Sequence, residues 1–105
     1  MADQRDPGLR EGTDLAEETR LQEPRLYRVM LLNDDYTTMD FVVKVIMAVF
    51  HLGAAVATRI MLDVHRTGRG VAGTYTRDIA MTKVAQVHEM ARANEFPLRA
   101  TAEEA

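Results

Sequence analysis

The feature that most constrains the fold is a polar break at residues 33–36, which separates two apolar runs of different spacing. Before the break, residues 26–32 are rich in large apolar side chains, which predicts a strand. After it, apolar residues recur at steps of three and four, which predicts a helix capped by Thr37 or Thr38 that ends near His51. A strand-to-helix turn needs polar residues for its backbone, so one Asn or Asp is ordinary there, but three in a row at residues 33–35 need a second reason. One candidate is a cluster of oxygens that accept hydrogen bonds from a cation.

The remaining sequence predicts two further helices and two further strands. The apolar spacing indicates a helix at residues 54–66, a further helix that Thr76 or Asp78 opens and that ends at about Asn94, and strands at residues 70–76 and 98–102. The second strand is expected to alternate, with one face formed by Val71, Gly73 and Tyr75. Three short strands cannot form a doubly wound sheet. We therefore expect an α+β domain in the order β-α-α-β-α-β, with a small three-stranded antiparallel sheet and three helices on one face.

The composition excludes several kinds of chemistry. The 105 residues suffice for one domain with a modest core, and they include neither cysteine nor serine. Disulfides, thiolate zinc sites and cysteine or serine nucleophiles are therefore excluded, and we expect no cofactor and no enzymatic activity. No apolar run reaches the roughly 18 residues of a membrane helix, and the charged N-terminus is not a signal peptide. We expect a cytoplasmic protein that does not enter a membrane.

Charge divides the chain into two parts. Residues 1–24 hold three arginines and seven acidic residues, a net charge of −4, whereas the whole chain carries −3. We expect a flexible acidic arm at residues 1–24 and one folded domain, a monomer, at residues 25–105. The domain is nearly neutral and has no basic stripe that would hold phosphates, so we expect no nucleic-acid partner.

A candidate binding site emerges where the first two predicted helices meet. Met61 and His65 are four residues apart, so they lie on one face of the second helix. If this face packs against the first helix, the two helices enclose an apolar pocket with a polar rim. The expected lining is Met39, Val42, Met61 and Val64, and the expected rim is Asn33, Asp34 and His65. An amide carbonyl, a carboxylate and a neutral imidazole nitrogen all accept hydrogen bonds, so the complementary ligand is an amine attached to a bulky apolar group.

Four segments of the chain resemble one known family: "YRVMLLNDDYTTMDFVV", "ATRIMLDVH", "TRDIAMTKVAQVHEMAR" and "NEFPL". They are similar to ClpS, the bacterial adaptor that delivers N-degron substrates to the Clp protease, and the similarity extends over about residues 27–101. In that family, the exposed N-terminal Leu, Phe, Tyr or Trp of a protein enters the pocket, and its α-amino group is held at the rim. The resemblance implies an adaptor whose partners are N-degron proteins or peptides and a ClpA-type AAA+ unfoldase.

The resemblance also implies roles for individual residues. Amine recognition falls to Asn33, Asp34 and His65. The implied pocket lining is Asp34, Thr37, Met39, Val42, Met61, Val64 and Leu98. Met39 is implied as the gate against β-branched side chains. The surface that faces the unfoldase is expected near Asp78 and Lys83, and the arm at residues 1–24 is expected to engage the unfoldase during delivery.

The chain departs from the common family pattern at three positions. Thr38 stands where proline usually precedes the gating methionine, Ala72 where cysteine is frequent, and Met81 where glutamate is usual. Alanine for cysteine should matter little. Thr38 frees the turn that aims Met39, and Met81 changes the surface for the partner. A divergent second copy of ClpS fits these departures, so substrate range, and whether the protein delivers or only sequesters substrates, stay open.

Three other interpretations of the same residues remain. Asp34 or Asp35 with His65 could form an acid–base pair of an enzyme, but no nucleophile accompanies them. The same residues with Asn33 could hold a divalent metal, although the spacing is not that of a calcium loop and one histidine is few for zinc. A scaffold that binds only a partner helix would not need acceptors for an amine. A packed structural histidine is the alternative for His65 itself.

Overall fold

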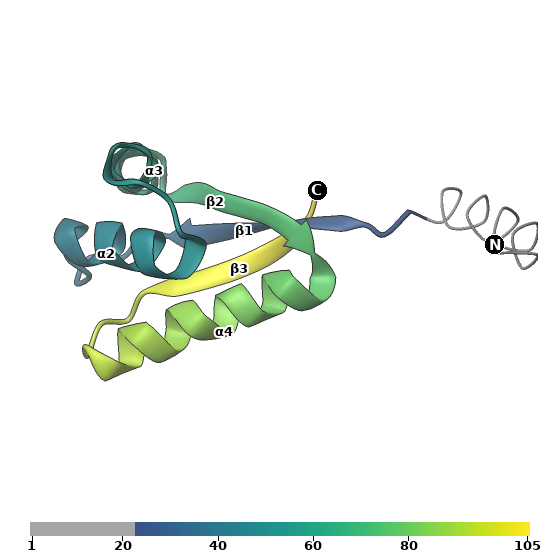
Figure 1. The fold of residues 1–105 in the computed structure, drawn as a ribbon. Helices are drawn as coiled ribbons and strands as arrows, with labels where there is room; N and C mark the ends of the chain where they lie inside the picture. The colour runs from purple at the N-terminus through teal and green to yellow at the C-terminus, as the bar shows by residue number, and fades with distance from the viewer. Residues whose placement is uncertain (1–22) are drawn as a thin grey trace, which may run out of the picture.

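The computed structural model describes residues 23–105, so the expected arm at residues 1–24 lies outside the described part except for its last two residues. The six elements are β1 (Leu26–Leu32), α2 (Met39–Phe50), α3 (Ala54–Thr67), β2 (Arg69–Thr76), α4 (Arg77–Ala93) and β3 (Arg99–Glu104) (Figure 1). Their order confirms the predicted β-α-α-β-α-β arrangement, and each begins and ends within about two residues of its prediction.

The sheet is built around β1. The strand order is β2-β1-β3, and both neighbours pair with β1 in the antiparallel direction. Leu31 of β1 is paired with Gly70 on one side and with Ala100 on the other. Because paired residues point to the same face, these three lie together on the core side, where Leu31 is fully buried. The predicted α+β class with a three-stranded antiparallel sheet is confirmed.

β2 contains an irregularity that the alternating sequence pattern did not reveal. Val29 pairs with Gly73, but the next residue, Met30, pairs with Val71, so Ala72 is an extra residue without a partner. Val71 therefore points away from the core and is exposed, whereas Ala72 is buried. The expectation of one alternating face through Val71 and Gly73 is wrong, because the bulge between them reverses the alternation.

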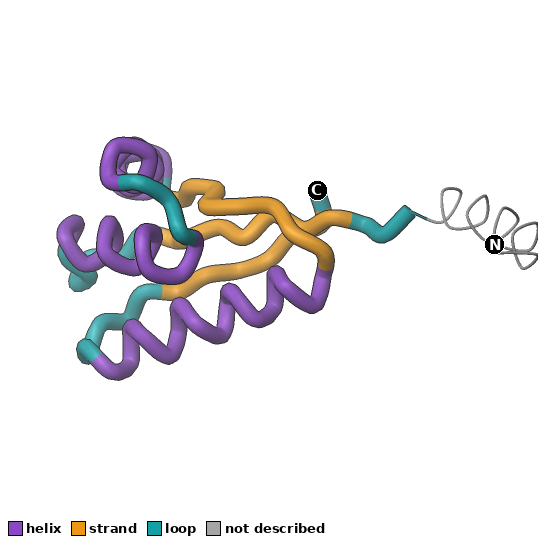
Figure 2. The backbone as a smooth tube through the Cα atoms, viewed as in Figure 1, coloured by secondary structure: helices purple, strands orange, loops and turns teal. Residues whose placement is uncertain are grey.

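The core lies between the helices and the face of the sheet that carries Val29 and Leu31. α4 runs lengthwise along the sheet, and α2 packs between α4 and α3 (Figures 1 and 2). Val45, Ile46 and Val87 are fully buried at this junction, and a side chain of this kind contributes about 1.5–3 kcal/mol when it is buried. Among residues 23–105, no helix combines the length and the apolar character that crossing a membrane requires.

Two helix ends fix the loop that follows β1. α2 begins after Thr38, whose Oγ1 accepts a hydrogen bond of 3.1 Å from the Phe41 N–H. α3 ends at Gly68, whose φ of +95° is accessible to glycine because it has no Cβ. The Gly68 carbonyl in turn accepts a hydrogen bond of 2.9 Å from the Asn33 N–H. The loop at residues 33–38 is therefore held between the start of α2 and the end of α3.

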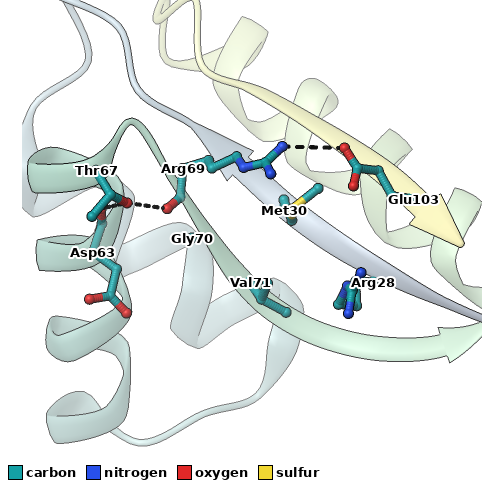
Figure 3. Close-up of a pocket in the computed structure, with 8 residues that line it drawn as sticks. All are labelled: Arg28, Met30, Asp63, Thr67, Arg69, Gly70, Val71 and Glu103. Carbon is teal, nitrogen blue, oxygen red and sulfur yellow. Dashed lines mark hydrogen bonds and ion pairs between the residues drawn. The ribbon is translucent and has the colours of Figure 1, made fainter. Parts of the chain in front are cut away.

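The other face of the sheet carries no helix from the described part of the chain. α3 stands beside the edge strand β2, so its Asp63 and Thr67 reach the margin of this face (Figure 3). Across the sheet, Arg69 Nη1 lies 3.4 Å from Glu103 Oε2. These side chains surround a hollow of about 500 Å³ whose floor includes Met30.

Candidate functional site

A pocket of about 360 Å³ opens where the loop at residues 33–38 meets α2 and α3. Its lining is Asn33, Asp34, Asp35, Tyr36, Thr37, Thr38, Met39, Val42, Met61, Val64 and His65. Eight of the nine residues predicted to bind a ligand are in this set. Side chains from three separate segments therefore converge on one hollow, as the spacing of the two helices required.

The floor of the pocket is apolar and comes from both helices. Val42 of α2 and Met61 and Val64 of α3 are buried. They belong to the same hydrophobic cluster as the core, so the floor is fixed by helix packing rather than by a mobile loop. Met39 begins α2, lines the pocket and is 48% exposed. A bulky apolar ligand group thus finds a rigid floor and a flexible thioether side chain in the same pocket.

Asp34 organises the loop between β1 and α2. Its Oδ1 accepts hydrogen bonds from the backbone N–H of Tyr36 at 2.8 Å and of Thr37 at 2.7 Å, and its Oδ2 accepts from the Thr37 hydroxyl at 2.7 Å. Partial burial alone raises the pKa of Asp34, but these three hydrogen bonds outweigh burial and hold the pKa below its usual 3.8. Asp34 is therefore a carboxylate at neutral pH, and it positions the loop as well as contributing negative charge to the rim.

The remaining rim groups are free to meet a ligand from the solvent side. Asn33 and His65 are exposed, and the backbone hydrogen bond from Asn33 to Gly68 brings the loop next to the end of α3. Asp34 Oδ2 accepts one hydrogen bond among the described residues, so it retains capacity for a second donor. A carboxylate, an amide carbonyl and a neutral imidazole nitrogen together suit a cation with several N–H donors, such as an ammonium group.

Three lining residues were not among the predicted site residues. Asp35, Tyr36 and Thr38 follow from their neighbours, because the loop that presents Asp34 presents them as well. Tyr36 is 78% exposed, which is unusual for a large aromatic side chain. Thr38 stands where proline is usual in the resembled family, and its capping hydrogen bond replaces the fixed backbone of proline in starting the helix that carries Met39.

Three predicted residues lie elsewhere. Leu98 precedes β3 and is buried in the core, outside the lining of the pocket. Asp78 is exposed in the first turn of α4. Lys83 is half-buried, and its Nζ donates a 2.7 Å hydrogen bond to the carbonyl of Val49 and lies 5.7 Å from the centre of the Tyr75 ring. The contacts of Lys83 within the described residues are thus internal to the fold.

The hollow on the opposite face of the sheet is larger but chemically less selective. It is lined by two arginines, Arg28 and Arg69, and by two carboxylates, Asp63 and Glu103 (Figure 3). Opposite charges balance there, and Arg69 is already paired with Glu103. The pocket at the loop instead offers acceptors over an apolar floor, so it is the better candidate for binding a defined ligand. Within residues 23–105, no group of three or more His, Asp or Glu side chains is arranged to hold a metal ion.

Comparison with known proteins assigns the chain to a family. Residues 22–101 match the family described as "ATP-dependent Clp protease adaptor protein ClpS". A ClpS protein of Syntrophus aciditrophicus (strain SB) is 66% identical over 87 residues, which cover 83% of this chain and 81% of that protein. A second, from Acetivibrio thermocellus, is 57% identical over 97 residues, which cover 90% and 98%. The chain belongs to the ClpS family.

A solved ClpS structure agrees with this assignment. Agrobacterium tumefaciens ClpS2 bound to L-phenylalaninamide is 42% identical, with a TM-score of 0.77 over 79% of this chain and all of that one. ClpS proteins are adaptors of the ATP-dependent Clp protease, not its catalytic component, so the predictions of a ClpS family member and of a non-enzyme are confirmed. The roles of individual residues in binding stay predictions.

Proposed function

We propose that this ClpS family member binds proteins through a free N-terminal α-amino group and a bulky hydrophobic first side chain, Leu, Phe, Tyr or Trp. One observation carries the proposal: a rim of hydrogen-bond acceptors borders an apolar floor within a single pocket. Phenylalaninamide, the ligand of the Agrobacterium ClpS2 structure, joins a free amine to a large apolar side chain, and this chemistry supports the proposal. The pocket volume of about 360 Å³ is in the lower range of small-ligand sites and suits one side chain.

The amine is assigned to three groups at the rim. Asn33 offers its amide carbonyl, Asp34 offers charge and the remaining capacity of Oδ2, and His65 offers a ring nitrogen. An α-ammonium group has three N–H donors, so each donor finds one acceptor. Loss of any of the three acceptors leaves a donor of the ligand unsatisfied. In the same way, an acetylated N-terminus has only one N–H donor and leaves acceptors of the rim unpaired, so the site is selective for an unmodified N-terminus.

The first side chain is assigned to the hollow beneath the rim. Val42, Met61 and Val64 form its floor, and Thr37 borders it. Met39, a half-exposed residue of the lining, is the proposed gate, because a branch at Cβ lies close to the backbone, where the methionine side chain would meet it. Leu and aromatic side chains are not branched at Cβ, so they are narrow close to the backbone and fit past Met39.

Delivery to the Clp unfoldase is the second half of the proposal. An adaptor of an ATP-dependent protease works where ATP and the protease are, so we propose that the protein acts in the cytoplasm. Contact with a ClpA-type unfoldase is assigned to the surface near Asp78 and Lys83 and to residues 1–24. A variant that lacks residues 1–24 should bind N-degron peptides with unchanged affinity and fail to deliver a labelled substrate for degradation by the unfoldase and protease.

A sequestering protein, which binds N-degrons without delivering them, is the alternative. Met81, at the position where the family usually has glutamate, is 50% exposed on α4 close to Asp78, so the proposed partner surface has lost a charge and gained an apolar group. Restoring the charge with Met81→Glu should increase delivery if the surface contacts the unfoldase. Equal delivery by both forms would argue against a partner contact at Met81.

Peptides that differ only in their first residue test the binding half of the proposal. The series should contain first residues Leu, Phe, Tyr and Trp, with Gly, Lys and Asp as controls, and affinities should be measured by fluorescence anisotropy. We expect binding only for the four bulky hydrophobic residues. Similar affinities across the series would reject the apolar pocket as the site of recognition.

A further inference from the structure

We propose that Met39 is an oxidation site that controls the binding pocket: hydroperoxides convert its thioether to the sulfoxide, and the modified pocket binds N-terminal hydrophobic side chains more weakly. The inference rests on the proposed function, since it concerns the same pocket. It adds a chemical modification that lowers the affinity of the adaptor when hydroperoxides accumulate.

Accessibility singles out Met39 from the other methionine of the site. Hydroperoxides must reach the sulfur atom, so the susceptibility of a methionine follows its exposure. Both methionines line the pocket, but Met39 is 48% exposed, whereas Met61 is 9% exposed. Oxidant therefore reaches the gate first, and the buried thioether of Met61 is protected by the helices packed around it.

The reaction is balanced without a cofactor. A lone pair of the Met39 sulfur attacks one oxygen of the hydroperoxide, so that an S–O bond forms and the O–O bond breaks. With hydrogen peroxide, the leaving hydroxide takes the remaining proton and departs as water. The sulfur loses two electrons and the peroxide is reduced by the same two. Methionine sulfoxide reductases reverse the product, which makes the modification a switch rather than permanent damage.

Methionine sulfoxide at residue 39 is unsuited to an apolar ligand because its oxygen is polar. Its oxygen is a strong acceptor, and the floor on which the ligand side chain is proposed to rest, Val42, Met61 and Val64, offers no N–H or O–H donor. The Thr37 hydroxyl, which lines the same pocket, already donates to Asp34. Without a bound peptide, water can reach this oxygen, because Met39 is 48% exposed. A bound side chain would cover it and leave it unpaired, which should weaken binding by about tenfold or more. By the same argument, a bound peptide covers the thioether and should slow its oxidation.

The chain supplies matched internal controls. Met47 on α2 and Met81 on α4 are 40% and 50% exposed, respectively, and neither lines the pocket. Their exposure is similar to that of Met39, so their sulfurs should react at similar rates. Only the reaction at Met39 should change peptide affinity.

The experiment treats the full-length protein with hydrogen peroxide and measures two quantities over time. Peptide mapping by mass spectrometry gives the sulfoxide fraction at each methionine, and anisotropy gives the affinity for a peptide with a free N-terminal Leu. Affinity should fall by about tenfold or more as Met39 is oxidised and recover after treatment with sulfoxide reductases. Saturating peptide should slow oxidation of Met39 and leave Met47 and Met81 unaffected.

Three substitutions separate the sites. Met39→Leu should show the same affinity before and after peroxide, whatever that affinity is, whereas Met47→Leu and Met81→Leu should lose affinity on treatment as the unaltered protein does. The inference is overturned if affinity is unchanged when Met39 is oxidised, or if the loss persists in Met39→Leu. Failure of the untreated protein to bind the peptide would overturn the proposed function itself and this inference with it.

Discussion

Lys83 Nζ donates a hydrogen bond of 2.7 Å to the backbone carbonyl of Val49, and this bond ties α4 to the C-terminal end of α2. The last carbonyls of a helix have no partner within the helix and carry partial negative charge, so an ammonium group stabilises them. α2 carries both the gate and part of the pocket floor. Lys83 therefore has a structural role in the fold, in addition to the partner contact predicted for it.

Replacing Lys83 with methionine keeps the length of the side chain and removes its charge and its donors. We expect Lys83→Met to lower the free energy of unfolding by about 1–2 kcal/mol, because a partly buried carbonyl loses a charged donor. Urea denaturation checks this value. Lys44→Met, at the only other lysine of the chain, is the matched control: Lys44 is exposed on α2, so its loss should change stability little. Equal effects of both substitutions would mean that the bond to Val49 contributes nothing.

The hydroxyl of Thr37 is expected to hold Asp34 in its ionised form. Removing it in Thr37→Val should raise the pKa of Asp34, because one of the three hydrogen bonds to the carboxylate is lost. NMR titration of the Asp34 side chain measures the change. Thr74→Val, on the exposed face of β2, serves as the control and should leave that titration unchanged.

The same carboxylate makes a defined contribution to acid stability. The pKa of Asp34 is lowered by folding, so the contribution is fully present above the unfolded value of about 3.8 and is lost as pH falls through the lower folded value. Thr37→Val should therefore destabilise the protein at neutral pH by about 1–2 kcal/mol and by less at the acid end. A destabilisation that does not shrink in acid would contradict this role of the hydrogen bond.

Truncation of the gate should widen the range of first residues. Met39→Ala removes the side chain that blocks a branch at Cβ, so peptides that begin with Ile or Val should gain affinity relative to the peptide that begins with Leu. Binding assays with these three peptides measure the ratio. Met47→Ala removes an exposed methionine from the same helix outside the pocket and should leave the ratio unchanged. If Met39→Ala weakens all three peptides equally, Met39 is ordinary packing and not a gate.

Removing the ring nitrogens of His65 should weaken peptide binding. The proposal assigns a ring nitrogen of His65 as one of three acceptors for the ligand ammonium group, so His65→Phe, which keeps an aromatic ring without an acceptor, leaves one N–H of the ligand unpaired. The affinity for a peptide with a free N-terminal Leu should fall by about tenfold. Isothermal titration calorimetry at neutral pH measures the change.

His88 supplies the control for this substitution. Its Nε2 accepts a hydrogen bond of 3.0 Å from the Ala100 N–H, which joins α4 to β3, so a change at His88 acts only through the fold. His88→Gln keeps an acceptor for that bond and should bind the peptide as the unaltered protein does. Unchanged affinity in His65→Phe, or an equal loss in both variants, would leave His65 without a role in amine binding.

The elements of the fold were predictable because their signals are local. The apolar spacing of residues 26–32 and 39–50, with Thr38 and Gly68 at helix ends, is determined by neighbouring residues alone. The bulge at Ala72 was not predictable, because it depends on how β2 is registered against β1 over a distance in sequence. A prediction from alternating residues assumes a regular strand, so it fails where a bulge inserts an extra residue.

The site was predictable to a similar extent. The four-residue step from Met61 to His65 and the polar residues after β1 predicted side chains that do line one pocket, because a helix face and a strand end have fixed geometry. Their roles in binding stay predictions. The hydrogen bonds that Asp34 and Lys83 form within the fold were not predictable, since they depend on donor–acceptor distances in the folded chain. Leu98 was assigned to the lining by resemblance alone, and its burial in the core needed the packed structure.

The most direct test of the account compares two peptides that begin with the same Leu and differ only in acetylation of the N-terminus. Acetylation removes the charge and leaves one N–H donor for the acceptors of Asn33, Asp34 and His65, while the first side chain stays the same. Calorimetric titration at neutral pH should give an affinity for the free peptide at least about tenfold higher than for its acetylated twin. Equal affinities for the two peptides would contradict recognition of the α-amino group at this rim.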